Sequence, residues 1–306
     1  MDTRPITSTT LAASVIAVPP LARDTNLGFN KAANANVIRH LEQGGVTTLL
    51  YGGNAALAHV AISEYAALLN ILVECAGNQT TLIPSVGPTY GLMMDQATIL
   101  REFSFPTAML LPSREATTPA GIASGLRRFV ERFGRPVVLY LKHDGMVDVK
   151  TVKQMCSDGL ISWIKYAIVR ENPEHDPFLS GLIDAIGTSL IVSGMGEKPA
   201  VVHLKQFGLA GFTSGSVCIA PKLSMNLLRA LHAKDYSTAE KIRERFLPLE
   251  KLRDTINPVR VLHAAVSLAG IADTGPITPF WSAIDASDEP AIRTAAQELL
   301  RDSTEA

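Results

Sequence analysis

Short apolar runs recur along this chain of 306 residues, and stretches with helical spacing separate them. A glycine often stands between the end of a helical stretch and the next run, as at Gly134, Gly159 and Gly187, and glycine is the residue that most readily closes a helix. The runs are rich in β-branched and aromatic residues, which is typical of strands buried on both faces. The sequence predicts strands within residues 14–18, 46–51, 80–86, 105–111, 135–141, 160–169, 189–193 and 209–213.

The alternation of strand and helix predicts a parallel sheet. Eight units of roughly 25 to 30 residues match an α/β fold of the (β/α)8 TIM barrel type. A doubly wound sheet fits less well, because no GxGxxG pattern follows the first run. After residue 221 only helical patterns remain, at 223–233, 237–256, 258–268 and 289–302. We therefore expect a barrel carrying the active site at residues 1–224 and a C-terminal helical bundle at residues 225–306.

The composition indicates which kinds of binding partner and which cell compartment to expect for this protein. A hydrophobic content of 47% and a net charge of −1 describe a globular protein, with no electrostatic reason to bind nucleic acid or an acidic membrane surface. The three cysteines are far apart and form no CxxC pair, so we expect reduced thiols in a cytoplasmic protein. The apolar stretch 11–18 is interpreted as a first core strand, because Pro19 and Pro20 follow it at once. No apolar run approaches the ~20 residues that would span a bilayer.

Lys165 is the only charged residue in the otherwise β-rich stretch 161–169. An amine buried in such a strand loses water, and its pKa falls below the usual value of about 10.4. A neutral lysine is a nucleophile that forms Schiff bases with ketones. Lys165 is therefore a candidate catalytic residue for a carbonyl substrate. The alternative is that Lys165 ends its strand and extends its amine into solvent.

Tyr140 ends the strand that precedes the one carrying Lys165. Neighbouring strands lie ~4.8 Å apart, so the phenol can approach the amine. A hydroxyl in that position can move protons as a Schiff base forms and breaks, which makes Tyr140 a second candidate catalytic residue. The alternative is an ordinary barrel tyrosine with a satisfied hydroxyl.

Small residues at other predicted strand ends are candidates for substrate binding. Tyr51, Gly52 and Gly53 close the second strand before a helical stretch, and paired glycines there would let backbone amides point at a carboxylate near a helix start. A tight turn without a binding role is the alternative. Ser193 and Thr213 end the seventh and eighth strands, where barrels often bind a ligand or a phosphate.

A metal site is the less favoured hypothesis for carbonyl activation. His143 and His175 each precede an aspartate in a loop, and such pairs could hold a divalent cation that polarises a carbonyl. No HxH or HExxH spacing supports this, so we expect neither a metal nor a cofactor. The remaining histidines fall in helical contexts and are expected to be structural: His40, His59, His203, His232 and His263.

Four stretches carry a resemblance to a known family: 138–140, 163–167, 191–194 and 211–216. Through them, and over most of its length, the chain resembles the dihydrodipicolinate synthase and N-acetylneuraminate lyase family of class I aldolases. The resemblance implies a barrel with a C-terminal helical bundle, Lys165 as the Schiff-base lysine and Tyr140 as the proton-transferring tyrosine. It also implies a pyruvate or other 2-oxo acid substrate, no cofactor, and assembly as a homodimer or homotetramer.

The chain departs from the family pattern at three places. Residues 49–53 replace the family's Gly-Thr-Thr-Gly-Glu, so the threonine that relays protons in synthases is missing. The tyrosine that many synthases lend to a partner subunit is replaced near Ser113 and Arg114, and residues 141–145 replace an Asn-x-Pro-x-Arg pattern. These departures argue against an authentic dihydrodipicolinate synthase. Lys142, His143 and Arg170 stand at strand ends where they could meet a polar substrate tail.

Taken together, the residues favour a lyase that joins Lys165 to a 2-oxo acid and then performs aldol cleavage or condensation. A dehydratase or deaminase of a sugar acid or cyclic amino acid, using the same lysine, is the nearest alternative. A noncatalytic metabolite-binding homologue is a further alternative, since the threonine relay is absent.

Overall fold

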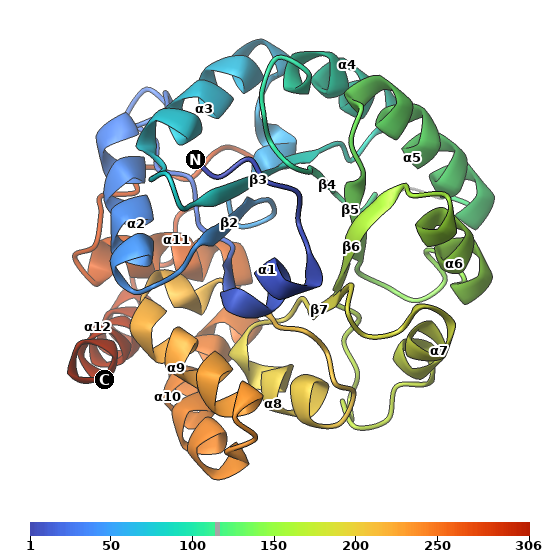
Figure 1. Cartoon of the computed structure of the whole chain (residues 1–306). Helices are drawn as coiled ribbons and strands as arrows, with labels where there is room; N and C mark the ends of the chain where they lie inside the picture. The colour runs from blue at the N-terminus through green and yellow to red at the C-terminus, as the bar shows by residue number, and fades with distance from the viewer. Residues whose placement is uncertain (114–116) are drawn as a thin grey trace.

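The computed structural model describes residues 1–113 and 117–306, so Arg114, where a replaced tyrosine was expected, lies outside the described residues. Within them, eight parallel strands form a sheet in the order β7-β6-β5-β4-β3-β2-β1-β8 (Figure 1). A bridge between Ser193 and Phe212 joins the two ends of the sheet. The predicted TIM barrel is confirmed. Its strands are β1 Ile16–Ala17, β2 Thr48–Tyr51, β3 Thr81–Val86, β4 Met109–Leu110, β5 Val137–Leu141, β6 Ile161–Tyr166, β7 Ile191–Ser193 and β8 Thr213–Ser214.

Helices surround the barrel as an outer ring (Figure 1). Helix α5 shows how the sequence sets its limits: the Thr118 side chain accepts a hydrogen bond from Gly121 N–H, Pro119 occupies the first turn, and Gly134 ends the helix with φ of 82°. The ring helices are α2 Lys31–Gln43, α3 Ile62–Cys75, α4 Tyr90–Leu100, α5 Pro119–Phe133, α6 Val149–Ser157, α7 Pro177–Ile186 and α8 Glu197–Lys205, with short 3-10 turns η1 Leu57–His59 and η2 Ser216–Cys218.

Helix α1 (Ser8–Ala13) corrects one expectation from the sequence. The stretch 11–18 was interpreted as a first core strand, with the strand placed within residues 14–18; its first residues, 11–13, are instead helical, and only Ile16 and Ala17 form β1. Thr7 and Thr10 form a capping box that starts α1, and Leu11 is buried. A Cβ on Gly211, which precedes β8, would lie 2.8 Å from the Leu11 carbonyl oxygen. Helix α1 thus closes the end of the barrel where the strands begin, and the opposite end holds the site.

The C-terminal helices pack together on one side of the barrel (Figure 1). They are α9 Pro221–His232, α10 Tyr236–Thr255, α11 Pro258–Leu268 and α12 Glu289–Glu305. These helices confirm the predicted C-terminal helical extension. The boundary proposed between residues 224 and 225 falls inside α9, and the division into two domains stays a prediction. Helix α10 contacts α8 and η2, which brings its buried residues close to the barrel.

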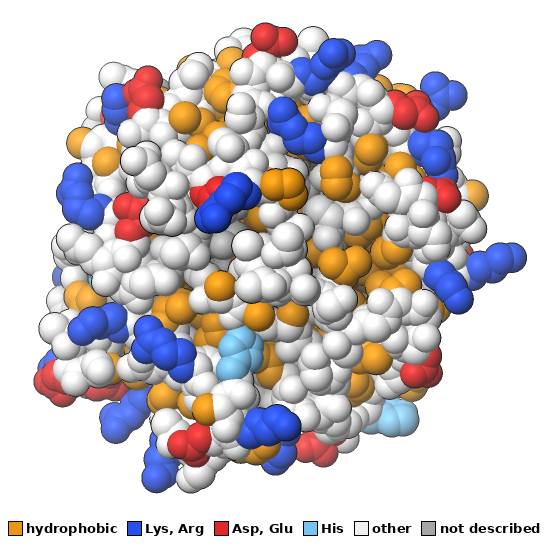
Figure 2. All heavy atoms as spheres, viewed as in Figure 1, with side chains coloured by type: hydrophobic (Ala, Val, Ile, Leu, Met, Phe, Trp, Pro, Cys, Tyr) orange, Lys and Arg blue, Asp and Glu red, His pale blue; other side chains and the backbone are white. Residues whose placement is uncertain are grey.

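Basic and acidic side chains are interspersed on the face shown in Figure 2, as the balanced composition leads one to expect. All three cysteines are free thiols. Among the described residues, no helix combines the length and the apolar character needed to cross a membrane.

Candidate active site

Lys165 and Tyr140 lie side by side inside the barrel. The two residues are paired across β5 and β6, and the Lys165 Nζ lies 4.6 Å from the centroid of the Tyr140 ring. Lys165 is only 4% exposed. The next residue, Tyr166, points the other way and donates a hydrogen bond to Asp176, the residue that caps α7. Because side chains alternate along a strand, Lys165 faces the lumen and does not extend its amine into bulk solvent.

The surroundings of Lys165 and Tyr140 shift the pKa values of the two side chains in opposite directions. Burial, together with the positive charges of Lys142 and Arg253, lowers the pKa of Lys165 to about 7. Burial raises the pKa of Tyr140 to about 12. Near neutral pH a large share of the amine is therefore uncharged, while the phenol keeps its proton. A nucleophile and a proton donor thus stand next to each other.

The absence of a side chain at Gly194 leaves space for the aliphatic part of the Lys165 side chain. A Cβ there would lie 2.9 Å from Lys165 Cγ and 2.8 Å from both the Tyr166 carbonyl oxygen and Ala167 Cβ. The Gly194 N–H also donates to the Tyr166 carbonyl at 2.6 Å. The glycine after β7 is therefore a packing requirement of the lysine on β6, and only the structure links the two positions.

Ser193 and Thr213 differ in where their side chains point. Ser193 pairs with Tyr166, and its Oγ lies 2.8 Å from His203 Nδ1 on α8, so it faces the helices and is not brought together with Lys165. Thr213 precedes Ser214, whose Oγ donates to Glu197 on α8. By alternation, the buried Thr213 side chain faces the lumen.

The end of β2 and the loop after it place Tyr51 toward the helices and Gly52 toward the lumen. The Tyr51 side chain is buried, and its hydroxyl is close enough to Cys218, Cys75 and Glu42 for their charges to affect its pKa, so it lies among the helices. Gly52 faces the lumen, where a Cβ would come within 2.8 Å of Met109 Cε.

The paired glycines do not begin an α-helix as the sequence suggested. The 3-10 turn η1 follows them, and α3 begins only at Ile62. Any anion held by the Gly52 and Gly53 amides would therefore not benefit from an α-helix dipole. A loop made of small residues, and not a helix end, borders the lumen here.

The aspartates of the two His-Asp pairs, Asp144 and Asp176, both form ion pairs with Arg170. Arg170 donates from Nη1 and Nη2 to Asp144 at 2.6 and 2.8 Å, and its Nε lies 3.1 Å from Asp176 Oδ2. Arg170 thus ties together the loops that follow β5 and β6, and this contact occupies the guanidinium that was expected to meet a substrate tail. In residues 1–113 and 117–306, no group of three or more His, Cys, Asp and Glu side chains could hold a metal ion.

Arg253, Glu250 and Glu197 form a buried charged cluster beside β8 that the sequence did not predict. Arg253 Nη1 lies 2.6 Å from Glu250 Oε1, and both side chains are at least nine-tenths buried. Glu197 accepts hydrogen bonds from Ser214 and Ser224. Burial, with the nearby Glu250 charge, raises the pKa of Glu197 to about 7. In the sequence, Arg253 and Glu250 look like ordinary surface charges of an amphipathic helix.

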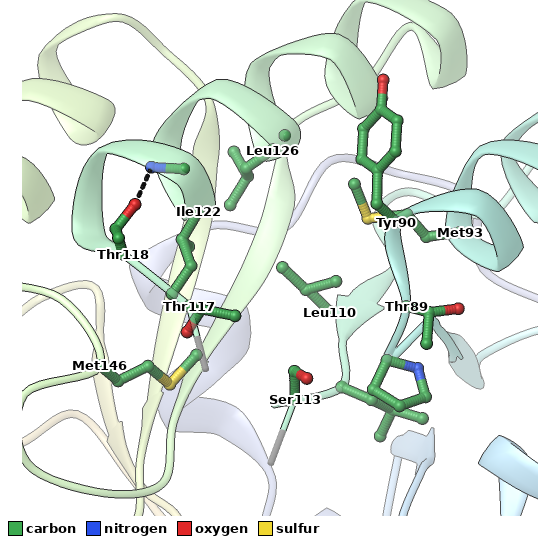
Figure 3. Close-up of a pocket in the computed structure, with 14 residues that line it drawn as sticks. Thr89, Tyr90, Met93, Leu110, Ser113, Thr117, Thr118, Ile122, Leu126 and Met146 are labelled. Atoms are coloured by element: carbon green, nitrogen blue, oxygen red, sulfur yellow. Dashed lines mark hydrogen bonds between the residues drawn. The ribbon is translucent and has the colours of Figure 1, made fainter. Parts of the chain in front are cut away.

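A cavity of about 340 Å³ lies away from this chemistry (Figure 3). Helices α4 and α5 and the segments after β3 and β4 surround it, and neither Lys165 nor Tyr140 lines it. Mostly apolar side chains form its walls, among them Met93, Leu110, Ile122, Leu126 and Met146. A polar exception in Figure 3 is Thr118, which is already engaged in capping α5. We therefore assign the candidate chemistry to the barrel lumen.

A TIM barrel with a C-terminal helical extension and a lysine buried in its lumen defines the class of protein. No protein-family model matches the chain. It is 23% identical over 279 residues to a probable 5-dehydro-4-deoxyglucarate dehydratase of Chelativorans sp., covering 88% of this chain and 90% of the relative. It is also 24% identical over 258 residues to a 4-hydroxy-tetrahydrodipicolinate synthase of Stutzerimonas stutzeri, and the match covers 82% of this chain and 86% of the relative.

Among solved structures, a Ruminococcus gnavus sialic acid aldolase matches with a TM-score of 0.82 at 14% identity, covering 96% of this chain and 99% of that one. That likeness concerns the fold, and the curated relatives add a likeness in sequence along most of the chain. The resemblance to the dihydrodipicolinate synthase and N-acetylneuraminate lyase family is thus seen in the fold and, at 23 to 24% identity, in the sequence.

Replacing Gly194 with alanine should destabilise the fold by about 1 to 3 kcal/mol, because the new Cβ overlaps backbone and the Lys165 stem. Gly53→Ala is the matched control, since no atom lies within 4 Å of a Cβ there. Urea unfolding of both variants and the unaltered chain measures the difference. Equal stability of the two variants would contradict the packing role of Gly194.

Proposed function

We propose that this chain is a lyase that forms a Schiff base between Lys165 and the ketone carbon of pyruvate or a related 2-oxo acid. One observation carries the proposal: a lysine that is 4% exposed faces the barrel lumen with its Nζ 4.6 Å from a tyrosine ring. The depressed pKa of the amine supports it, because only the uncharged form attacks a carbonyl. The resemblance to the family of class I aldolases, supported by a 4-hydroxy-tetrahydrodipicolinate synthase among the relatives, agrees with this chemistry.

In the proposed mechanism, uncharged Lys165 Nζ forms a bond to the ketone carbon, and one amine proton moves to the former carbonyl oxygen, giving a carbinolamine with a hydroxyl. Tyr140 donates a proton to that hydroxyl, which leaves as water and gives a protonated imine.

For cleavage, the substrate is a 2-oxo acid with a hydroxyl on C4. Tyr140, now deprotonated, takes the proton of that hydroxyl as the C3–C4 bond breaks, so C4 leaves as an aldehyde and the electron pair of the bond forms an enamine with the imine as acceptor. Tyr140 then returns the proton to C3, and water hydrolyses the imine to release the shorter 2-oxo acid and free Lys165. Condensation is the same sequence in reverse.

The substrate carboxylate would lie on the side of the lumen opposite β5 and β6. We propose that the Gly52 and Gly53 amides and the Thr213 hydroxyl border it, because these residues are small and Gly52 and Thr213 face the lumen. The Ser193 and Tyr51 side chains face the helices, so any part they play would be structural. We further propose that the chain works as a cytoplasmic homodimer or homotetramer without a cofactor, as its family resemblance implies.

Dehydration through the same lysine is a second candidate activity, favoured by two curated relatives described as probable 5-dehydro-4-deoxyglucarate dehydratases. In that reaction the imine would lose a proton from C3 to give the enamine, the C4 hydroxyl would accept a proton and leave as water, and no carbon–carbon bond would break. Analysis of the products from a set of 2-oxo acids would separate the two activities. A shorter oxo acid plus an aldehyde would indicate aldol cleavage, and a product lighter by one water would indicate dehydration.

Cyanoborohydride with pyruvate should leave a covalent adduct on Lys165, detectable by peptide mass spectrometry. Because the folded pKa is lowered to about 7, the share of reactive amine rises as pH increases through 7 and levels off above it. The initial rate of pyruvate-dependent adduct formation between pH 5.5 and 8.5 should follow that curve. Lys165→Met is the control and should give no adduct at that peptide. An unmodified Lys165 in the unaltered chain would end the Schiff-base proposal.

Tyr140→Phe should slow turnover about 10²- to 10⁴-fold, because it removes the hydroxyl that moves protons while keeping the ring beside the amine. Steady-state kinetics on the substrate found by product analysis would measure this. Substrate binding should change much less than the turnover number. Full activity of the variant would show that another group transfers the proton.

A further inference from the structure

Arg253 reaches the barrel mouth from outside the barrel. It belongs to α10 in the C-terminal extension, yet its Nη2 would lie 2.7 Å from a Cβ at Gly215. Gly215 directly follows β8, at the end of the barrel where the strands finish. Without a side chain at that position, the guanidinium lies against the loop. The sequence Thr213-Ser214-Gly215-Ser216 therefore admits an arginine that is distant along the chain.

A second nitrogen donor meets Arg253 at the same point. Asn54 Nδ2 would lie 2.9 Å from the same Gly215 Cβ, and it donates to the Val18 carbonyl at 2.7 Å. Asn54 follows Gly53 after β2, and Val18 follows β1. The guanidinium and the amide thus gather at the ends of β8, β1 and β2, across the lumen from β5 and β6.

Two of the three nitrogens of the Arg253 guanidinium make hydrogen bonds to the described residues, and the third makes none to them. Nη1 lies 2.6 Å from Glu250 Oε1 and 3.4 Å from Ser216 Oγ, and Nε donates to the Pro258 carbonyl at 3.3 Å. No hydrogen bond from Nη2 to any of the described residues is present, although the side chain is only 10% exposed. Nη2 is thus a charged donor that has no protein partner among the described residues, and a ligand that accepts a hydrogen bond from it would form a charge-assisted one.

We propose that Arg253 anchors the substrate carboxylate next to the ketone, with Nη2 and the Asn54 amide as its donors and Glu250 as the residue that positions the guanidinium. The inference rests on the proposed Schiff-base function and names its substrate class: 2-oxo acids bind, and neutral ketones of the same shape bind far less well. Arginine is suited to this task because its charge-assisted hydrogen bonds to a carboxylate are short and strong.

The test compares pyruvate with its neutral amide, pyruvamide, as ligands for cyanoborohydride trapping on Lys165. The unaltered chain should be half-saturated by pyruvate at a much lower concentration than by pyruvamide. The double variant Glu250→Gln and Arg253→Gln removes both charges of the pair together, so that neither is left buried alone. Its half-saturating pyruvate concentration should rise about 10- to 100-fold, the loss expected for a hydrogen bond to a charged group. Its response to pyruvamide should stay within about threefold, a range that is small beside that loss.

Two further variants complete the experiment. Lys251→Gln, which removes an exposed positive charge on the same helix, should leave both half-saturation values unchanged. Gly215→Ala keeps every charged group but displaces Nη2 and Asn54, and it should weaken pyruvate trapping in the same direction as the double variant. Alanine fits the backbone at 215, where φ is −87°.

The outcomes separate the two proposals. Absence of any adduct in the unaltered chain would overturn the Schiff-base function itself. An adduct in the unaltered chain, with unchanged pyruvate half-saturation in the folded double variant or in Gly215→Ala, would overturn the role of Arg253 alone. Should neither variant fold, equal half-saturation of the unaltered chain by pyruvate and pyruvamide would overturn it, and a strong preference for pyruvate would support it.

Discussion

The loss of water around the Lys165 amine is the constraint on which the site depends. A lysine amine exposed on the surface would carry a charge near neutral pH and could not attack a carbonyl. In this barrel the amine is surrounded by the lumen walls, and the charges of Lys142 and Arg253 add to the effect of burial. The barrel thus supplies reactivity through position, because it keeps the group away from solvent and close to like charges. The same burial raises the pKa of Tyr140, so its hydroxyl keeps its proton and can donate it.

Glycines shape the barrel so that these groups can meet. Gly194 leaves space for the stem of Lys165, Gly52 faces Met109 across the lumen, and Gly215 allows Arg253 to approach the mouth. At the other end, Gly211 accommodates the backbone of α1 beside Leu11. The close packing of protein interiors makes each of these positions sensitive to a single added carbon. The glycines near the strand ends therefore each leave room for one particular neighbouring group.

Much of the fold could be predicted from the chain. Each observed strand lies in or overlaps a predicted run, and α5 begins and ends where Thr118 and Gly134 indicate. The exception is α1, because a short apolar stretch of this kind fits a strand or a buried helix equally well, and the capping box at Thr7 was not taken into account. The direction of side chains was predictable only in part. Tyr51 and Ser193 stand at strand ends as expected, but the alternation along each strand turns them toward the helices.

By itself, the sequence determined the barrel, the helical extension and the pairing of Lys165 with Tyr140, because these follow from local periodicity and from neighbouring strands in a parallel sheet. Only the tertiary structure decided that Gly194 makes room for Lys165, that Arg170 joins the loops after β5 and β6, and that Arg253 crosses from α10 to the mouth. Residues far apart in the chain make these contacts, and nothing in local spacing records which distant side chain fills a given space. Burial then gave these groups their chemical character, since the same lysine or arginine on a solvated surface would be an ordinary charge.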